Sequence, residues 1–180
     1  SRCQVWCIGP CRTSAPVLSS RITYSMNVLM SRRASHRSRR RALVARIATA
    51  FAKAGHEVTL LTFRPRGVLE LDGEQQPFAF RSLQPFDTRL DWFAPGLLRA
   101  AAEAAPDLVL CMGRMANCYA GFIQRRVPRA AVVCTMRTGK LLPYLFVRSL
   151  RLCRHIIANS HVAKRVLTDV HDIPSHKITV

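Results

Sequence analysis

The sequence predicts a doubly wound α/β domain whose mostly parallel, Rossmann-like sheet carries helices on both faces. Two observations support this fold class. Short apolar runs alternate with helix-like segments from residue 26 to the end of the chain. Most of these runs are continuously apolar, as in strands buried on both faces. Because right-handed crossovers place helices on the two faces of such a sheet, the alternation indicates a layered α/β fold.

The first 25 residues show neither sustained periodicity nor a capped element. We therefore expect residues 1–25 to form an unstructured N-terminal extension and residues 26–180 to form one domain, a size that a single core supports. Three cysteines of the extension recur every four residues, as ligands of a cluster on one helical face would: Cys3, Cys7 and Cys11. Gly9 and Pro10 interrupt that helix, so an extension is the favoured interpretation. Its removal is expected to leave the domain folded.

The first predicted unit is a strand at residues 27–30, a helix from about Arg39 to Ala54 and a strand at 57–63. Ser38 is expected to cap the helix at its start, and Gly55 to end it in the left-handed conformation. The helix carries an apolar stripe at helical spacing, made of Leu43, Val44, Ile47, Ala48 and Phe51.

The remaining elements follow the same alternation. A third strand at 77–83 is expected at the edge of the sheet, followed by a helix at 95–105 with proline at its start. The later strands are expected at 107–112, 130–136 and 155–159, and the later helices at 115–126, 143–152 and 161–170.

The chain is strongly basic, with 28 lysines and arginines, 10 acids and a net charge of +18. No acid precedes Glu57, and none lies between Asp107 and Asp169. Such a charge favours an anionic partner, which leaves nucleic acid, a phosphorylated substrate or a membrane surface.

Seven scattered cysteines without a signal peptide do not suggest a disulfide framework, so a reducing cytoplasm is expected. Cys111 and Cys118 are interpreted as core residues. No apolar run approaches the 18 or so residues that cross a bilayer, so any membrane contact is expected to be peripheral, at the inner membrane.

Ligands of doubly wound sheets bind beyond the carboxyl ends of the strands, so the candidate site residues are those that follow the predicted strands. The candidates for substrate or phosphate binding are Ser35, Arg37, Arg39 and Arg40 after the first strand, Gly113 and Arg114 after the fourth, Arg137, Thr138, Gly139 and Lys140 after the fifth, and Asn159 and Ser160 after the sixth.

The loop after the first strand is the most basic of these, with six arginines between Arg32 and Arg41. A helix N-terminus already favours an anion, and guanidinium groups add bidentate phosphate contacts. The alternative is a solvated basic face. Asn159 or Ser160 can serve as the cap of the following helix as well as contact a ligand.

The loop "CTMRTGKL" resembles a phosphate loop but departs from its pattern at Cys134 and Leu141, which argues against a nucleotide triphosphatase. The histidines show no metal-ligand spacing, so no metal and no cofactor is expected. No convincing pair of catalytic carboxylates is found, because Asp87, Asp91, Glu103 and Asp107 are scattered over predicted loops and helices. The catalytic residues stay unassigned.

Three segments carry a family resemblance. They are "MNVLM" with "ALVARIATAFAKAGHEVTLLTF", then "PDLVLCMG", and "HIIANSHVAKRVLTDVHDIPSHKITV". Together they resemble the N-terminal half of GT-B glycosyltransferases, particularly the large retaining family 4. The resemblance implies an acceptor-side domain that works with a second, donor-binding domain missing from this chain, and a nucleotide sugar as co-substrate.

Two positions depart from the family pattern. The family's first loop usually contains glycines that approach the donor diphosphate, whereas residues 34–41 contain none. The histidine that often ends the fifth strand falls on Arg137, while Asn159 and Ser160 fit unchanged.

The resemblance implies a hexosyltransferase-like enzyme that moves sugar from a nucleotide sugar to an anionic, lipid-linked glycan such as a lipopolysaccharide core, in cell envelope biosynthesis. As this isolated half it is expected to be inactive. The alternative is a basic nucleic-acid-binding α/β module, which rests on charge alone because no RNA- or DNA-reading signature is present. A third possibility is a small phosphate-binding α/β protein of unrelated chemistry.

Overall fold

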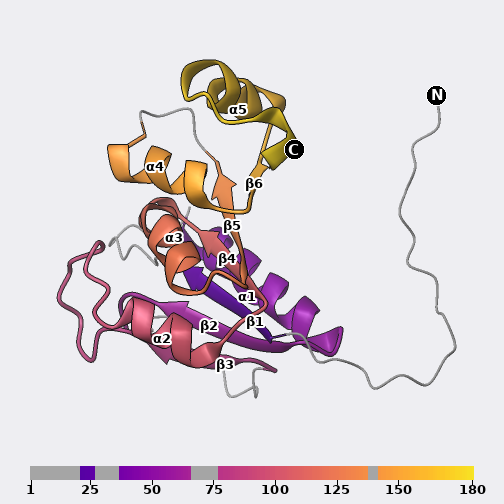
Figure 1. Ribbon diagram of the computed structural model, residues 1–180. Coiled ribbons are helices and arrows are strands. Elements are labelled where there is room, and N and C mark those ends of the chain that lie inside the picture. Colours follow the sequence, from indigo (N-terminus) through magenta and orange to yellow (C-terminus); the bar gives the residue numbers. More distant parts are fainter. Residues whose placement is uncertain (1–20, 27–36, 66–76, 138–141) are drawn as a thin grey trace, which may run out of the picture.

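A computed structural model describes residues 21–26, 37–65, 77–137 and 142–180 of the chain (Figure 1). In residues 21–26 and 37–42 it describes the backbone only. The described part forms one α/β body built around a parallel sheet.

The sheet has seven strands in the order β3-β2-β1-β4-β5-β6-β7, and every neighbouring pair is parallel. The strands are β1 (Arg21–Met26), β2 (Glu57–Thr62), β3 (Ala79–Ser82), β4 (Leu108–Met112), β5 (Ala131–Met136), β6 (His155–Ala158) and β7 (Ile178–Thr179). The predicted fold class is therefore confirmed, with β3 at the edge as expected.

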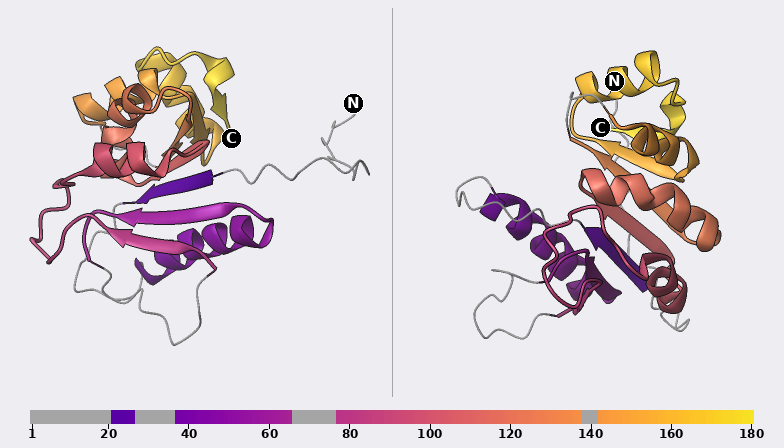
Figure 2. Two further views of the ribbon diagram at one scale, coloured as in Figure 1. Left: turned by 60° about the horizontal axis from the view of Figure 1, so that its bottom comes forward. Right: turned by 90° about the vertical axis from the view of Figure 1, so that its left-hand side faces the viewer.

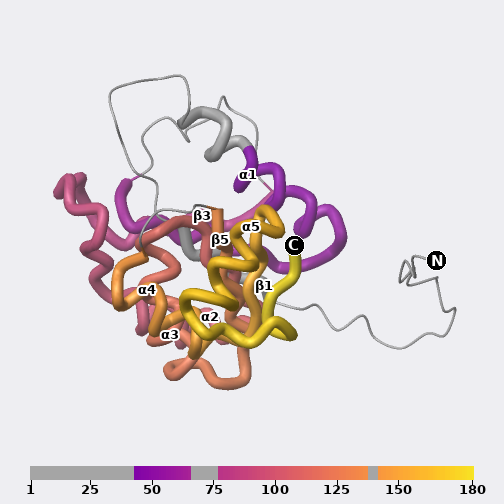
Figure 3. Tube along the Cα trace, turned by 90° about the horizontal axis from the view of Figure 1, so that it is seen from above, coloured from indigo at the N-terminus to yellow at the C-terminus, as the bar shows by residue number. Residues whose placement is uncertain are grey.

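Helices cover both faces. They are α1 (Arg37–Lys53), α2 (Leu97–Ala104), α3 (Arg114–Arg126), α4 (Tyr144–Leu152) and α5 (His161–Arg165), which a π-helical segment (Val166–Val170) continues. One core cluster joins α1 to residues such as Val58 and Leu110, and a larger one joins α2, α3, α4 and α5 to residues such as Val109 and Val132. Alternate strand residues thus face different helices, and α1 lies across the sheet from α2, α3 and α4 (Figures 2 and 3).

The first strand lies earlier than the sequence predicted. β1 comprises residues 21–26, between β2 and β4, so residues 21–25 belong to the domain and not to an extension. The predicted strand at 27–30 lies outside the described residues. A chain beginning at Met26 would lack five of the six residues of this strand, which lies inside the sheet. Removal of residues 1–25 is therefore expected to damage the sheet, contrary to the prediction from sequence.

Helix α1 begins at Arg37, so Ser38 lies inside the helix and does not cap it. Its end follows the prediction, since Gly55 has φ +89 and His56 donates a backbone hydrogen bond to the carbonyl of Phe51. On α1, Val44 and Ala48 are buried against the sheet, and Ile47 and Phe51 beside them are partly buried.

Most other boundaries agree with the sequence to within two residues. An additional strand, β7, has only two residues and pairs with β6 after a short 3-10 turn (Ser175–Lys177). A strand of this length has too little periodicity to be recognised in the sequence.

Helix α3 is attached to β5 by two side-chain amides. Asn117, which is buried, accepts from the backbone N–H of Thr135 at 3.3 Å and donates to its carbonyl at 2.7 Å. Two turns later, Gln124 accepts from the N–H of Val132 at 3.2 Å and donates to the carbonyl of Ala130 at 3.0 Å. The two amides satisfy backbone groups near both ends of β5, so they fix the helix along the strand.

Helix α4 packs closely on α3 because Gly121 has no side chain. A Cβ built at this position would lie 3.0 Å from Leu152 Cδ1 and 3.1 Å from the Cα of Ser149. The buried Ser149 hydroxyl donates to the carbonyl of Cys118 at 2.7 Å. Glycine at this position therefore sets the distance between the two helices.

We predict that Gly121→Val lowers the free energy of unfolding by about 1–3 kcal/mol, the usual cost of overpacking a core. Gly121→Ala serves as control, because better helix propensity partly offsets its smaller clash. Urea unfolding followed by circular dichroism measures both. A valine variant as stable as the native chain would show that the helices can separate at no cost.

Candidate functional site

The order of the strands defines a switch point beside β1. From β1 the chain moves to β2 and β3 on one side, then returns to β4 on the other. In open α/β sheets a ligand crevice forms outside the carboxyl ends of the strands at such a point. The loops after β1 and β4 are therefore the expected walls of the site.

Gly113 connects β4 to α3 with φ +111 and ψ 156, a conformation that is essentially restricted to glycine. Its carbonyl accepts from the N–H of Asn117 in the first turn of α3. Arg114, the first residue of the helix, is exposed next to the strand end. The structure thus places both predicted residues at the switch point and shows why the first of them is glycine.

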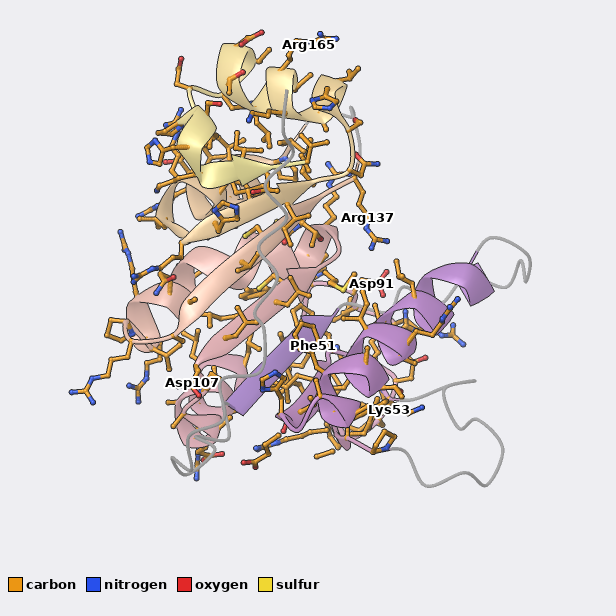
Figure 4. The ribbon with its side chains drawn as sticks, turned by 90° about the vertical axis from the view of Figure 1, so that its right-hand side faces the viewer. Phe51, Lys53, Asp91, Asp107, Arg137 and Arg165 are labelled. Carbon is orange, nitrogen blue, oxygen red and sulfur yellow. The ribbon has the colours of Figure 1, made fainter. Side chains whose placement is uncertain are left out.

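The ends of β5 and β6 are joined through two more candidates. The N–H of Asn159 donates to the carbonyl of Met136 at 3.0 Å, and its side-chain amide donates to the carbonyl of Arg137 at 3.5 Å. Ser160 caps α5, accepting from the N–H of Ala163 at 3.2 Å. Arg137 is exposed on the same side of the molecule as Asp91, whereas Asp107 lies on the opposite side, before β4 begins (Figure 4).

Ser35, Thr138, Gly139 and Lys140 lie outside the described residues, and Arg37, Arg39 and Arg40 are described only as backbone in the first turns of α1. Because that helix follows β1, its start belongs to the same edge of the sheet as Gly113 and Arg137. The candidates whose side chains are described therefore lie after three strands of one edge, β4, β5 and β6.

A buried arginine that sequence reasoning missed organises the loop between β3 and α2. Arg64, two residues after β2 and 5% exposed, donates to both carboxylate oxygens of Asp87 at 2.6 and 2.7 Å. A further guanidinium N–H donates to Asp91 at 2.8 Å. The two aspartates, interpreted as scattered, thus converge on one cation. Their spacing of four residues in a loop carries no signal that would have revealed this in the sequence.

The same loop is fixed from inside by Gln84. Its buried side chain donates to the carbonyls of Leu90 and Phe93 at 3.0 and 2.6 Å and accepts from the hydroxyl of Thr88 at 2.8 Å. The loop lies where the arrows of β1, β2 and β3 end (Figure 2). It is therefore a fixed wall at the carboxyl edge.

Two of the acids named from the sequence, Asp87 and Glu103, are held in their ionised form by arginines. The Arg64 guanidinium holds the pKa of Asp87 below its ordinary value, mainly through their hydrogen bonds. Arg99 and Arg81 do the same for the pKa of Glu103, which lines a hollow of about 370 Å³ at the end of β3 with both arginines. These carboxylates stay ionised in ion pairs, so the edge is suited to holding and orienting charged groups.

The buried thiols belong to the core, as predicted for Cys111 and Cys118. Burial raises the pKa of both. Among the residues that the structure describes, no group of three or more histidines, cysteines and acids is placed to hold a metal ion. In the same part of the chain no helix is both long enough and apolar enough to cross a bilayer.

Comparison with known families matches residues 42–180 to the sequence model of Glycosyltransferase Family 4. The chain belongs to glycosyltransferase family 4. The match includes every described element except β1 and the first turns of α1. No curated protein matches the chain.

Among solved structures, the family 4 chain is similar to Anabaena HepE (Alr3699), solved in complex with UDP and glucose. The TM-score is 0.60 at 14% identity, and the likeness covers 89% of this chain and 43% of HepE. The chain thus spans less than half the length of that protein. At this identity the likeness concerns the fold, which is the Rossmann-like N-terminal domain of the GT-B architecture.

We predict that Gly113→Ala destabilises the fold by about 1–3 kcal/mol, because a side chain is strained at φ +111. Gly55→Ala, at φ +89 with open space around its Cβ and remote from the switch point, measures the cost of a side chain at positive φ without a clash. Urea unfolding compares the two. Equal stability of native chain and Gly113→Ala would mean that the loop relaxes without cost.

The ion pair of Arg64 and Asp87 should make stability depend on pH in the acid range. Because folding lowers the pKa of Asp87, its contribution is complete above the unfolded pKa of about 3.9 and is lost as the pH falls through the folded value. Asp87→Asn should therefore reduce stability at pH 7, and the difference from the native chain should shrink below about pH 4. Thermal unfolding from pH 2 to 7 tests this, and a difference that is constant with pH would contradict it.

Proposed function

We propose that this chain is the acceptor-side half of an enzyme that transfers a sugar from a nucleotide-sugar donor. The observation that supports this most is the family 4 match across residues 42–180, on a sheet whose switch point carries Gly113 and Arg114. HepE, the structural neighbour, was solved with UDP and glucose, in keeping with a nucleotide-sugar donor.

In this proposal, phosphate is bound by cationic side chains at the carboxyl edge of the sheet. Arg114 and Arg137 follow β4 and β5, and the start of α1, which carries Arg37, Arg39 and Arg40, follows β1 at the same edge, whereas Lys140 lies outside the described residues. Guanidinium groups bind phosphate through paired, charge-assisted hydrogen bonds. They would hold the diphosphate of the donor, or a phosphate of the acceptor, and stabilise the charge that develops as the diphosphate departs.

The absence of a suitable acid among the named carboxylates bears on the mechanism. Asp87 and Asp91 are occupied by Arg64, and Asp107 lies on the opposite side of the molecule. We propose that transfer with retention of configuration depends on positioning and on charge stabilisation, without a carboxylate pair from this half. No cofactor is needed besides the nucleotide sugar.

The acceptor is proposed to be an anionic, lipid-linked glycan such as a lipopolysaccharide core. Its support is the charge of the chain, +18, and the absence of acids between Asp107 and Asp169. The enzyme is proposed to act in the cytoplasm, against the inner leaflet. Nucleic acid would suit the same charge, but membership of family 4 favours the glycan.

We predict that the isolated 180-residue chain transfers no sugar, because it spans 43% of a protein with the same architecture, and closure between two halves completes such a cleft. Calorimetry with a nucleotide sugar is expected to show no micromolar binding. Micromolar affinity in the isolated chain would contradict this division of roles.

In a protein that carries both halves, Arg137→Ala is predicted to lower kcat about 10- to 100-fold, the effect of losing one charge-assisted phosphate contact. The assay uses acceptor in detergent, so that membrane attachment plays no part. Arg129→Ala is the matched control, since this exposed arginine lies in the turn before β5, at the other edge of the sheet. If both variants lose activity equally, or neither does, the role of Arg137 at the site is wrong.

A further inference from the structure

The outer surface of α2, α3 and α4 contains two grooves of different chemistry, one on each side of α3. Phe122 lines the first and Arg125 the second, and both residues are exposed one turn apart on the same helix. The two grooves therefore open on one continuous surface, remote from the α1 face of the sheet.

The first groove is apolar. It has a volume of about 330 Å³ between α2 and α3, and its walls include Leu98, Tyr119 and Phe122. The hydroxyl of Tyr119 donates to the carbonyl of Trp92 at 2.6 Å, which attaches the β3–α2 loop to the helix. That loop exposes Phe86, Leu90, Trp92 and Phe93, with Trp92 55% and Phe86 70% exposed. Large apolar side chains gathered on one surface mark an interaction site.

Two polar side chains, Arg64 and Gln84, hold this exposed loop in place. Arg64 binds the carboxylates on both sides of Leu90, at Asp87 and Asp91, while Gln84 binds the carbonyls of Leu90 and Phe93. A loop that is fixed in this way cannot turn its aromatic residues inward without breaking the partly buried ion pairs of Arg64. The fold therefore keeps Trp92 and Phe86 on the outside.

The second groove is cationic. It has a volume of about 680 Å³ between α3 and α4, and Arg125, Arg148 and Arg151 line it together with Tyr144, Val147 and Leu152. Neither α3 nor α4 contains an acid, and within the described residues no ion pair involves any of the three arginines. Arg151 donates to the carbonyl of His171 at 3.1 Å, which holds its side chain beside α4.

We propose that this surface docks on an anionic phospholipid bilayer. The arginines of the second groove bind lipid phosphates, while Trp92, Phe93, Leu98 and Phe122 enter the interfacial layer beside them. Phosphate is the anion that paired guanidinium groups recognise, and aromatic side chains favour the boundary between headgroups and acyl chains. Arginines without carboxylate partners next to exposed aromatic residues fit this partner better than a second copy of the chain, which would bring the same cations together.

The position of the surface would bring the carboxyl edge of the sheet close to the membrane. The loop that carries Trp92 lies at the carboxyl edge, where the proposed acceptor would bind. A docked protein would thus meet a lipid-linked acceptor at its cleft, and in this respect alone the inference rests on the proposed function. Lipid binding itself requires neither donor nor acceptor, so it can be measured independently.

Sedimentation of the 180-residue chain with vesicles tests the arginine groove. Binding should be strong to vesicles of phosphatidylcholine with 30 mol% phosphatidylglycerol and weak to phosphatidylcholine alone. Arg125→Ala with Arg148→Ala should weaken binding about 30-fold, about fivefold for each basic residue lost near an anionic surface. The matched control, Arg46→Ala with Lys53→Ala, removes the same charge from exposed positions of α1 and should change binding much less.

Fluorescence tests the aromatic side of the surface. The chain contains two tryptophans, Trp6 and Trp92, so Trp6→Phe leaves Trp92 as the only reporter. Its emission should shift to the blue on binding to the anionic vesicles and should be quenched by lipids brominated near the headgroup. Phe122→Gln in this background should weaken binding severalfold, whereas Leu43→Gln on α1 should not.

Each alternative partner has its own outcome. Failure of the native chain to bind anionic vesicles would overturn the proposal, as would equal losses in the groove variant and its α1 control. If light scattering shows a dimer that Phe122→Gln dissociates while vesicle binding is unchanged, the surface joins two copies and the proposal is wrong. Circular dichroism confirms that each variant is folded. None of these outcomes bears on the transferase proposal, which the donor and turnover measurements test separately.

Discussion

The attachment of α3 to the backbone of β5 is the interaction on which the rest of the domain depends. Asn117 and Gln124 give buried backbone groups of β5 partners near both of its ends. The helix is therefore fixed in position along the strand as well as packed against it. These four hydrogen bonds therefore position Gly113 and Arg114 at the start of α3. They also position the grooves on both sides of the helix.

A similar use of buried polar groups fixes the wall beside the switch point. Arg64 draws two aspartates onto the end of β2, and Gln84 binds three groups of the loop that contains them. Because Arg64 and Gln84 are buried, leaving either of them without partners would cost more than its hydrogen bonds contribute. The domain thus has a fixed carboxyl edge on which charged side chains can be displayed.

The sequence predicted the fold and most elements because its apolar runs are long enough to show their period, as in 107–112 and 130–136. It misplaced β1, since Arg21–Met26 contains arginine, threonine and serine and lacks the apolar run of a buried strand. Of the candidate site, Gly113, Arg137, Asn159 and Ser160 follow strand ends as predicted. Arg64 and Asn117 were missed because the sequence does not distinguish a buried arginine or amide from a solvated one. Only tertiary contacts distinguish them.

The stretch of chain without acids also has a consequence for folding itself. From residue 108 to residue 168 no carboxylate accompanies the basic side chains, so this half of the domain has almost no internal counter-ions. Its positive charges repel one another, and the repulsion opposes the compact state. Dissolved anions must supply the compensation, since salt screens charges beyond about 8 Å at physiological strength. The folded state therefore draws part of its stability from the small ions of the surrounding solution.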